Sequence, residues 1–250
     1  MKKTKWFLIL LVVQLMVAHS ALAQGYPIKV ALYSDDGTGD SRFDVEAALS
    51  DTTLFDVTHV LGADIRAGIL QNFDIVIHPG GSGSGQAESL QESGRDSVRA
   101  FINRGGGYLG ICAGSYLASS DYTWSLNILN TKVIDKAHWA RGTGPVDVRF
   151  NNFGKEMFGF SADTVVIDYY QGALMAPSDN SAIPPYIEAG IFASEIAENG
   201  APSGVMIGTC AFAFGVYGEG RAVAFSPHPE LTSGREYMVA DAVQWATSSD

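Results

Sequence analysis

Short apolar runs alternate with amphipathic stretches along the first half of the chain. The runs that predict strands are residues 28–33, 55–61, 73–78 and 108–111. Apolar side chains recur at helical spacing over residues 42–49 and 86–103, and residues 65–70 allow a short helix. Strands that alternate with such helices indicate an α/β fold with a mainly parallel sheet and helices on both faces.

Beyond residue 125 the apolar runs become shorter and glycine, asparagine and proline separate them. Strands are predicted over residues 133–134, 146–150 and 165–167, and residues 204–225 predict two or three more, including a hairpin. A closing helix is expected over residues 232–247. Because no internal repeat, heptad pattern or long linker interrupts this series, residues 24–250 are interpreted as one domain.

The first 23 residues have a different character. Lys2, Lys3 and Lys5 precede an apolar run from Trp6 to about residue 18, and Ala21-Leu22-Ala23 follows it. A basic start, an apolar centre and a small-x-small site predict a signal peptide cleaved after Ala23. The run is too short to span a bilayer as a helix. We therefore expect a periplasmic or secreted protein without a stable membrane span, the alternative being an uncleaved anchor.

Composition and charge exclude several classes of protein. Of the 250 residues, 46% are hydrophobic, which is typical of a folded globular chain. The formal net charge is −11, and removal of residues 1–23 would leave 13 basic against 27 acidic residues, or −14. Such an acidic chain is not expected to bind nucleic acid. The two cysteines cannot form a four-thiolate zinc site, and without other metal-ligand spacing we expect neither a metal nor a cofactor.

The first segment with candidate chemistry is Gly110-Ile111-Cys112-Ala113-Gly114, where a predicted strand runs into a small-residue helix. A nucleophile at such a bend is held on a strained elbow above the sheet, and the two glycines keep neighbouring chains clear. The N-terminus of the helix would favour the thiolate of Cys112. The alternative is a buried structural cysteine at a tight packing point.

Two other segments also follow predicted strands. His228 stands between prolines in the run 226–230, where it could accept a proton from a thiol and where Glu230 could hold its second ring nitrogen. Gly80 and Gly81 follow the strand that ends at residue 78 and could present backbone N–H groups to an oxyanion. Alone, the first segment could be a surface turn and the second a plain glycine turn. Together, all three fall at strand C-termini, where open α/β sheets bind ligands.

This combination resembles the class I glutamine amidotransferase-like superfamily, which has a Cys-His-Glu triad on a flavodoxin-like sheet. Within it, residues 103–116 (NRGGGYLGICAGSY) look like the N-terminal domain of biotin–protein ligases, which has free-standing bacterial relatives. The resemblance covers most of residues 27–247, with a loose match in the middle third. It implies Cys112 as the nucleophile, His228 as general base and acid, and Glu230 as the residue that orients His228.

The same resemblance implies an oxyanion hole made by the N–H groups of Ala113 and of Gly80 or Gly81. The expected reaction is thiolate attack on an amide or acyl carbonyl of a small or peptide-like molecule, followed by thioester hydrolysis, as in an amidase or γ-glutamyl hydrolase. Glutamine-using relatives usually have glutamine four residues after the cysteine, where this chain has Tyr116. Glutamine amidotransfer is therefore not expected. Biotin transfer is not expected either, because nothing in the sequence resembles the biotin ligase catalytic domain, and a binding or scaffold domain without turnover is the alternative.

Several other residues are weaker candidates for substrate binding. Tyr116, Arg141, Tyr170 and Gln171 could contact a substrate, and Arg141 could bind a carboxylate in bidentate fashion or simply form a surface ion pair. The loop after the first strand, with Asp35, Asp36 and Thr38, reads as a solvated acidic loop that could line the same edge. Cys210 lies in an apolar stretch and is expected to be buried and inert, although export would make a disulfide between Cys112 and Cys210 conceivable.

Overall fold

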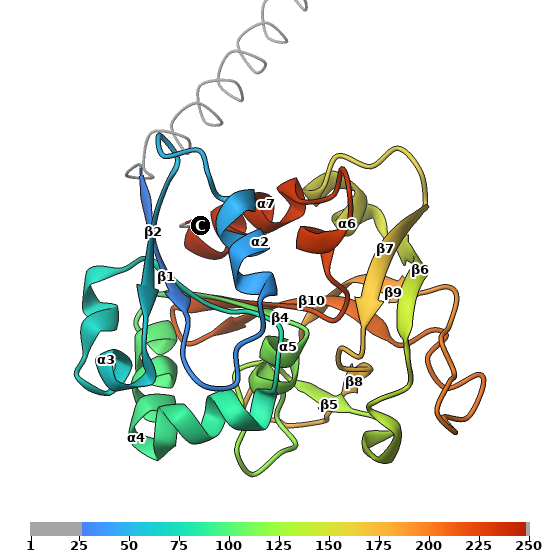
Figure 1. Cartoon of the computed structure of the whole chain (residues 1–250), viewed down its shortest axis with the longest axis horizontal. Helices are drawn as coiled ribbons and strands as arrows, with labels where there is room; N and C mark the ends of the chain where they lie inside the picture. The colour runs from blue at the N-terminus through green and yellow to red at the C-terminus, as the bar shows by residue number, and fades with distance from the viewer. Residues whose placement is uncertain (1–26, 249–250) are drawn as a thin grey trace, which may run out of the picture.

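The computed structural model describes residues 27–248, so the predicted signal peptide lies outside the described residues. These residues form a mixed sheet of eleven strands with the order β2-β1-β3-β4-β11-β10-β9-β6-β7, and β5 and β8 are attached beside β10. Figure 1 shows the sheet running through the middle of the molecule. The strands are β1 Ile28–Tyr33, β2 Phe55–Val60, β3 Ile75–His78, β4 Gly107–Ile111, β5 Thr131–Val133, β6 Thr143–Phe150, β7 Thr164–Tyr170, β8 Met175–Pro177, β9 Ile187–Phe192, β10 Cys210–Tyr217 and β11 Gly220–Phe225.

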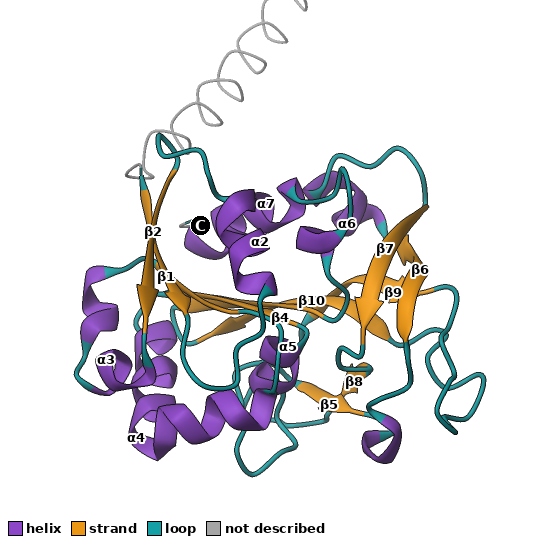
Figure 2. Ribbon diagram, in the orientation of Figure 1, coloured by secondary structure: helices purple, strands orange, loops and turns teal. Residues whose placement is uncertain are grey.

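The first five strands of this order, β2-β1-β3-β4-β11, are all parallel to their neighbours. Their arrangement is the doubly wound order of flavodoxin-like sheets, which confirms the predicted fold class. The α-helices are α2 Ser41–Ala48, α3 Gly62–Arg66, α4 Gly83–Asn103, α5 Ala113–Ala118, α6 Asn152–Met157 and α7 Tyr237–Thr247. Helices α2 and α7 lie on one face of the parallel strands, and α3, α4 and α5 lie on the other (Figure 2).

The other side of the sheet is antiparallel. β10 pairs with β11, β9 with β10, β6 with β9, and β7 with β6, all in antiparallel register. The sequence did not predict β8, β9 or α6. β9 follows two prolines and has no strict alternation of buried and exposed positions, while β8 and α6 are only three and six residues long. Short elements of this kind depend on pairing with distant segments rather than on a periodic pattern.

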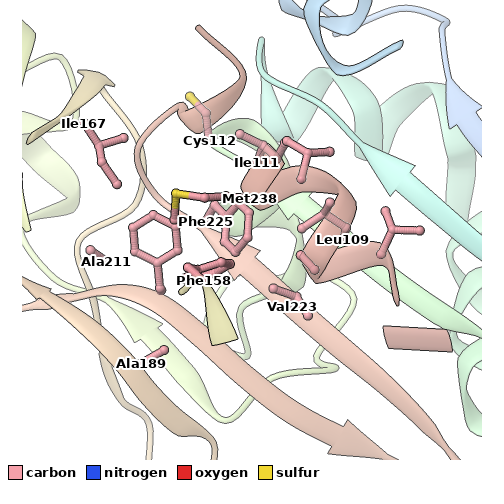
Figure 3. Packing of buried hydrophobic residues seen from close by; sticks show 14 of the residues in the cluster. Leu109, Ile111, Cys112, Phe158, Ile167, Ala189, Ala211, Val223, Phe225 and Met238 are labelled. Carbon is pink, nitrogen blue, oxygen red and sulfur yellow. The ribbon is translucent and has the colours of Figure 1, made fainter. Parts of the chain in front are cut away.

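Alternate side chains of each parallel strand enter two separate hydrophobic layers. In β3, Ile75 and Ile77 join the layer beneath α2 and α7, and Val76 joins the layer beneath α4. Figure 3 shows the first layer around Phe225 and Met238, with Cys112 at its margin. Both faces of the central strands are therefore buried, which explains why they read as continuous apolar runs.

The last helix starts later than its sequence pattern predicts. The pattern indicated a helix from residue 232, but α7 begins at Tyr237, and a short 3-10 helix covers Pro229–Leu231. Thr232 is engaged in tertiary contacts instead, because its hydroxyl donates to the carbonyl oxygen of His228 and accepts from the N–H of Asp168. Within the described residues, no helix combines the length and the apolar character needed to cross a membrane.

Candidate active site

Cys112 occupies a sharp bend between β4 and α5. Its backbone has φ 52° and ψ −99°, a strained conformation for a residue with a side chain. A Cβ atom at Gly110 would lie 2.4 Å from the carbonyl oxygen of Gly114, and one at Gly114 would lie 2.1 Å from that of His78. Both positions therefore require glycine, because the bend brings backbone segments into direct contact.

The thiol of Cys112 lies at the edge of the core and is 6% exposed. Its Sγ donates a hydrogen bond of 3.3 Å to the carbonyl oxygen of Tyr170, at the end of β7. The backbone N–H of Cys112 donates to the carbonyl oxygen of Phe225, at the end of β11, over 2.8 Å. Strands from the parallel and the antiparallel parts of the sheet thus both hold the bend in place.

His228 follows β11 and has its ring fixed from one side by Glu230. The Nδ1 atom of His228 lies 2.6 Å from Oε1 of Glu230, and both side chains are buried. The backbone N–H of His228 donates to the carbonyl oxygen of Asp168 over 2.7 Å. Among the described residues, Nε2 of His228 has no partner at ordinary hydrogen-bond geometry. Because Glu230 occupies Nδ1, the interaction of His228 with Cys112 falls to Nε2, which faces the site.

The electrostatic surroundings of His228 favour the imidazolium form. Burial lowers the pKa of His228, but the negative charge of Glu230 and then that of Cys112, with hydrogen bonding from both, raise this pKa well above its usual value of 6.5. The arrangement places a histidine that favours its protonated form between Cys112 and Glu230.

Gly80 brings the glycine turn to the same place. A Cβ atom at Gly80 would lie 2.8 Å from Cε1 of His228 and 3.7 Å from Cβ of Cys112, so the three predicted segments converge. The carbonyl oxygen of Gly80 accepts from the N–H of Gly39 over 2.8 Å, while the N–H groups of Gly80, Gly81 and Ala113 form no backbone hydrogen bond within residues 27–248. These three donors are free to bind a ligand oxygen.

A cavity of about 360 Å³ opens beside Cys112. Tyr116, Tyr170, Gln171 and Gly81 line it together with Cys112. The hydroxyl of Tyr116 donates to the carbonyl oxygen of Gln171 over 3.0 Å, which fixes that ring at the wall of the cavity. Of the weaker substrate-binding candidates, the structure brings Tyr116, Tyr170 and Gln171 to the thiol.

Arg141 is not part of this lining. Its side chain is 1% exposed and forms an ion pair with Asp135, whose other carboxylate oxygen lies 2.5 Å from Nδ1 of His138. The backbone of Arg141 is also held, because its carbonyl oxygen accepts from the N–H of Glu198 over 2.8 Å. The structure gives Arg141 an internal partner and not the surface ion pair that the sequence allowed.

Several contributors to the site carry no motif in the sequence. Ser41 places its buried hydroxyl 2.9 Å from the position of a Cβ at Gly80, and this hydroxyl has no partner among the described residues. Tyr122, Trp124 and Trp139 line the cavity. Tyr122 and Trp124 are explained from the sequence as core residues, whereas Trp139 lies in the same short segment as the weak candidate Arg141. These aromatic residues lie outside every regular apolar run, and this was the only signal in the sequence that could have indicated a role in the cavity.

His78, which ends β3, and Asp35, which follows β1, both have structural partners. His78 lies between the rings of Tyr33 and Tyr108 and binds Gln86 through Nδ1, and burial lowers the pKa of His78 to about 4. Asp35 accepts hydrogen bonds from the N–H of Gly62 and the hydroxyl of Ser89. Asp35 therefore contacts α3 and α4, while Thr38 in the same loop pairs with Gly81 and so supports the glycine turn beside the cavity.

Both cysteines are free, but their surroundings differ. Cys210 is fully buried in β10, and burial raises the pKa of its thiol well above the usual value. Cys112 instead borders the cavity. No cluster of three metal-ligating side chains occurs between residues 27 and 248.

The first half of the domain is similar to a known protein family. Residues 30–141 match the family described as "Biotin-protein ligase, N terminal". The matched segment contains Cys112, Gly80 and Gly81, and ends before His228 and Glu230. None of the curated protein sequences matches this chain.

Solved structures are similar over most of the chain. The structure of PurLQS from Thermotoga maritima is 16% identical, with a TM-score of 0.61, and the match covers 87% of this chain and 97% of that chain. A ThuA-like protein from Parabacteroides merdae is 13% identical with a TM-score of 0.61, and the match covers 89% and 90% of the two chains. A β-galactosidase from Rahnella sp. R3 is 14% identical with a TM-score of 0.56, over 87% of this chain but 31% of that one.

Proposed function

Because this chain has a glutamine amidotransferase-like fold that includes a biotin-protein ligase N-terminal segment, we propose that it is a cysteine-dependent hydrolase. The substrate is an amide or another acyl compound. Cys112 is the nucleophile, His228 is the general base and acid, and Glu230 orients His228.

One observation carries this proposal. His228 is buried, its Nδ1 is occupied by Glu230 at 2.6 Å, and its Nε2 is left without an ordinary hydrogen-bond partner among the described residues. The structural histidine His78 also has a buried Nε2 without a partner, but its Nδ1 binds the neutral amide of Gln86. His228 differs because a carboxylate holds its Nδ1 and because its ring and Cys112 both adjoin Gly80, as a base directed at a nucleophile requires.

The reaction follows from these positions. The thiolate of Cys112 attacks the carbonyl carbon, the bond to the leaving nitrogen or oxygen breaks, and the imidazolium of His228 gives its proton to the leaving group. The acyl group is then a thioester on Sγ. Water attacks that thioester while His228 takes its proton, which releases the acid and restores the thiol pair.

The oxyanion of each tetrahedral intermediate needs fixed donors. We propose the N–H groups of Ala113 and of Gly80 or Gly81 for this role, because they form no backbone hydrogen bond within residues 27–248 and lie around the bend at Cys112. Preorganised backbone donors of this kind stabilise the developing charge without reorganisation.

Alkylation by iodoacetamide at pH 7, followed by mass spectrometry, tests the state of the thiol. We expect rapid labelling of Cys112 in the native protein, and labelling of Cys210 only after denaturation, because Cys210 is fully buried. An unassisted thiol with a pKa of about 8.5 is only a few per cent thiolate at pH 7. Loss of the imidazolium in His228→Asn should therefore slow labelling of Cys112 by up to about 30-fold.

The internal control is Cys210, which must be labelled only after denaturation in both the native protein and the His228→Asn variant. The proposal fails if native Cys112 reacts no faster than an unstructured thiol, or if His228→Asn leaves its rate unchanged.

A binding domain without turnover is the second candidate. It is favoured by the hydrogen bond from Sγ of Cys112 to the carbonyl oxygen of Tyr170, which requires the protonated thiol. Tyr116 at the position of a substrate-positioning glutamine points the same way. Hydrolysis of a panel of amides and thioesters that disappears in Cys112→Ser would exclude this candidate.

A further inference from the structure

The cavity beside Cys112 is an open cleft. We propose that this cleft accepts a carbonyl compound with a neutral planar ring, such as an aryl group, on one side of the carbonyl. This inference rests on the proposed function and names its substrate class. Its basis is the lining of the cleft, where aromatic side chains from four separate segments meet at the nucleophile. The aromatic set consists of Tyr116, Tyr122, Trp124, Trp139 and Tyr170.

The aromatic set is ordered by contacts among its own members. The rings of Tyr122 and Trp124 stack with centroids 4.5 Å apart, and Tyr116 lies 6.3 Å from Tyr122 in a tilted arrangement. The indole of Trp124 approaches the start of α4, where a Cβ at Gly83 would lie 3.2 Å from it. These rings form a preorganised wall, so a planar group can stack without first ordering them.

Two members of the set are more exposed than a core role requires. Trp139 is 57% exposed and Tyr170 is 45% exposed, although both border the cleft. Aromatic surface at the rim of a cavity that contains a reactive group is typical of a ligand site. The cavity of about 360 Å³ has room for about ten to twelve non-hydrogen atoms, at roughly 30 Å³ each. A single ring with an amide group fits that space.

The charge of the lining argues for a neutral ligand. Lys136 is the charged member among the described residues that line the cleft, and no carboxylate lines it. The Nζ of Lys136 already binds Oδ2 of Asp121 at 2.7 Å and lies over the ring of Tyr122 at 4.2 Å. A free amino acid would find no carboxylate for its ammonium group, and a cationic ligand would meet Lys136 at the aromatic wall.

Equilibrium binding to the full chain carrying Cys112→Ala tests this inference without turnover. The probes are phenylacetamide and N-benzylacetamide, which place the ring on either side of the carbonyl, and cyclohexylacetamide, glutamine and choline. By ligand-observed NMR, we expect one of the ring amides to bind about three- to tenfold more tightly than cyclohexylacetamide, from stacking beyond simple burial. Glutamine and choline should bind more weakly still.

Trp139→Ala should reduce the preference for the ring, while Phe43→Ala should leave it unchanged. Phe43 is the matched control because it is 53% exposed and does not line the cleft. Equal binding of the cyclohexyl and ring amides, tighter binding of glutamine or choline, or an unchanged preference in Trp139→Ala would each overturn the inference. Because iodoacetamide labelling of Cys112 does not depend on a ring, the two proposals can fail separately.

Discussion

Cys112 adopts φ 52° because contacts with three neighbouring residues hold the backbone in this conformation. Its N–H is bound to Phe225, its thiol to Tyr170, and the following turn lies against His78. A residue with this backbone conformation is held by its surroundings and not by its own preference. At the scale of single residues, the site therefore depends on fixed neighbours, and two ionisable groups allow this dependence to be measured.

Glu230→Gln should lower the pKa of His228. The negative charge of Glu230 is the largest cause that raises this pKa, and burial alone acts in the opposite direction. NMR titration of the His228 ring should show the lower value, and the pH profile of Cys112 alkylation should move to higher pH, because the imidazolium no longer supports the thiolate at neutral pH. An unchanged profile would contradict the assigned interaction.

His78→Phe should make stability less sensitive to acid. In the native protein the pKa of His78 is about 4, while the unfolded chain has about 6.5. The unfolded state therefore takes up a proton first, and the native protein loses stability as the pH falls from about 6.5 to 4, by about 3 kcal/mol for this group.

Urea denaturation at several pH values checks this expectation. The variant should be less stable than the native protein at pH 7, by about 1–3 kcal/mol, since the buried Oε1 of Gln86 loses its hydrogen bond with His78. Its loss of stability between pH 6.5 and 4 should nevertheless be smaller. Parallel pH dependences in the two proteins would show that His78 is not the responsible group.

Individual elements bring the aromatic residues and the reactive groups together. Residues 135–142 form a strap that carries Lys136 and Trp139 to the cleft, and the ion pair between Arg141 and Asp135 closes this strap internally. Its far side is tied by the hydrogen bond from Nδ2 of Asn199 to the carbonyl oxygen of Ala140, at 2.8 Å. The strap therefore depends on a buried charge pair.

Arg141→Met should loosen the strap, because it removes the permanently charged partner of Asp135 and leaves this largely buried carboxylate with His138 alone. Limited trypsin digestion should then cleave after Lys136 faster than in the native protein, and mass spectrometry of the fragments reports this. Arg149→Met is the control, since Arg149 is exposed on β6. Equal cleavage in both variants would mean that the ion pair does not hold the strap.

For the whole molecule, the match to the biotin-protein ligase N-terminal family covers only part of the folded unit. β4, which leads into Cys112, pairs along its whole length with β11 from the other end of the sequence. The helix α7 covers one face of this parallel sheet. His228 and Glu230 also lie beyond the matched residues, so the site is divided between the two halves of the chain.

A chain of residues 27–141 should therefore not fold by itself. Without β11 and α7 it would expose the edge of β4 and the apolar layer that contains Leu109 and Ile111. We expect circular dichroism without a cooperative thermal transition, and aggregation on size-exclusion chromatography, where residues 27–248 should be monodisperse and cooperative. A cooperatively folded short fragment would disprove this expectation.

A second prediction for the whole molecule concerns its export. We propose that residues 1–23 are a signal peptide, and N-terminal sequencing of the protein recovered from the periplasm or medium of an expressing bacterium should begin at Gln24. Replacement of Ala21 and Ala23 by bulky residues should block processing, because the peptidase requires small side chains there. Processed protein in such a variant, or a native protein that keeps Met1, would contradict the proposal.

Local sequence patterns were sufficient to predict the strands and helices of the parallel half of the sheet. β1 has the predicted bounds of residues 28–33, and β2, β3, β4 and α4 differ by a few residues at their ends. These elements are apolar or amphipathic over their whole length, so their periodicity reports their structure directly. The elbow around Cys112 was equally readable, because strand, glycines and small-residue helix are adjacent in sequence.

Tertiary structure alone decided the rest of the site. The hydrogen bond from Cys112 to Tyr170, the contact of Gly80 with His228 and the aromatic wall join residues from 41 to 171 with those near 228. Their sequence separation leaves no periodic signal, and β9, which lies between β10 and β6 in the antiparallel part of the sheet, has no strict alternation of buried and exposed positions either. The sequence by itself determined which groups could react, since chemistry is a property of side chains. Which of them meet, and around what space, depended on the pairing of distant strands.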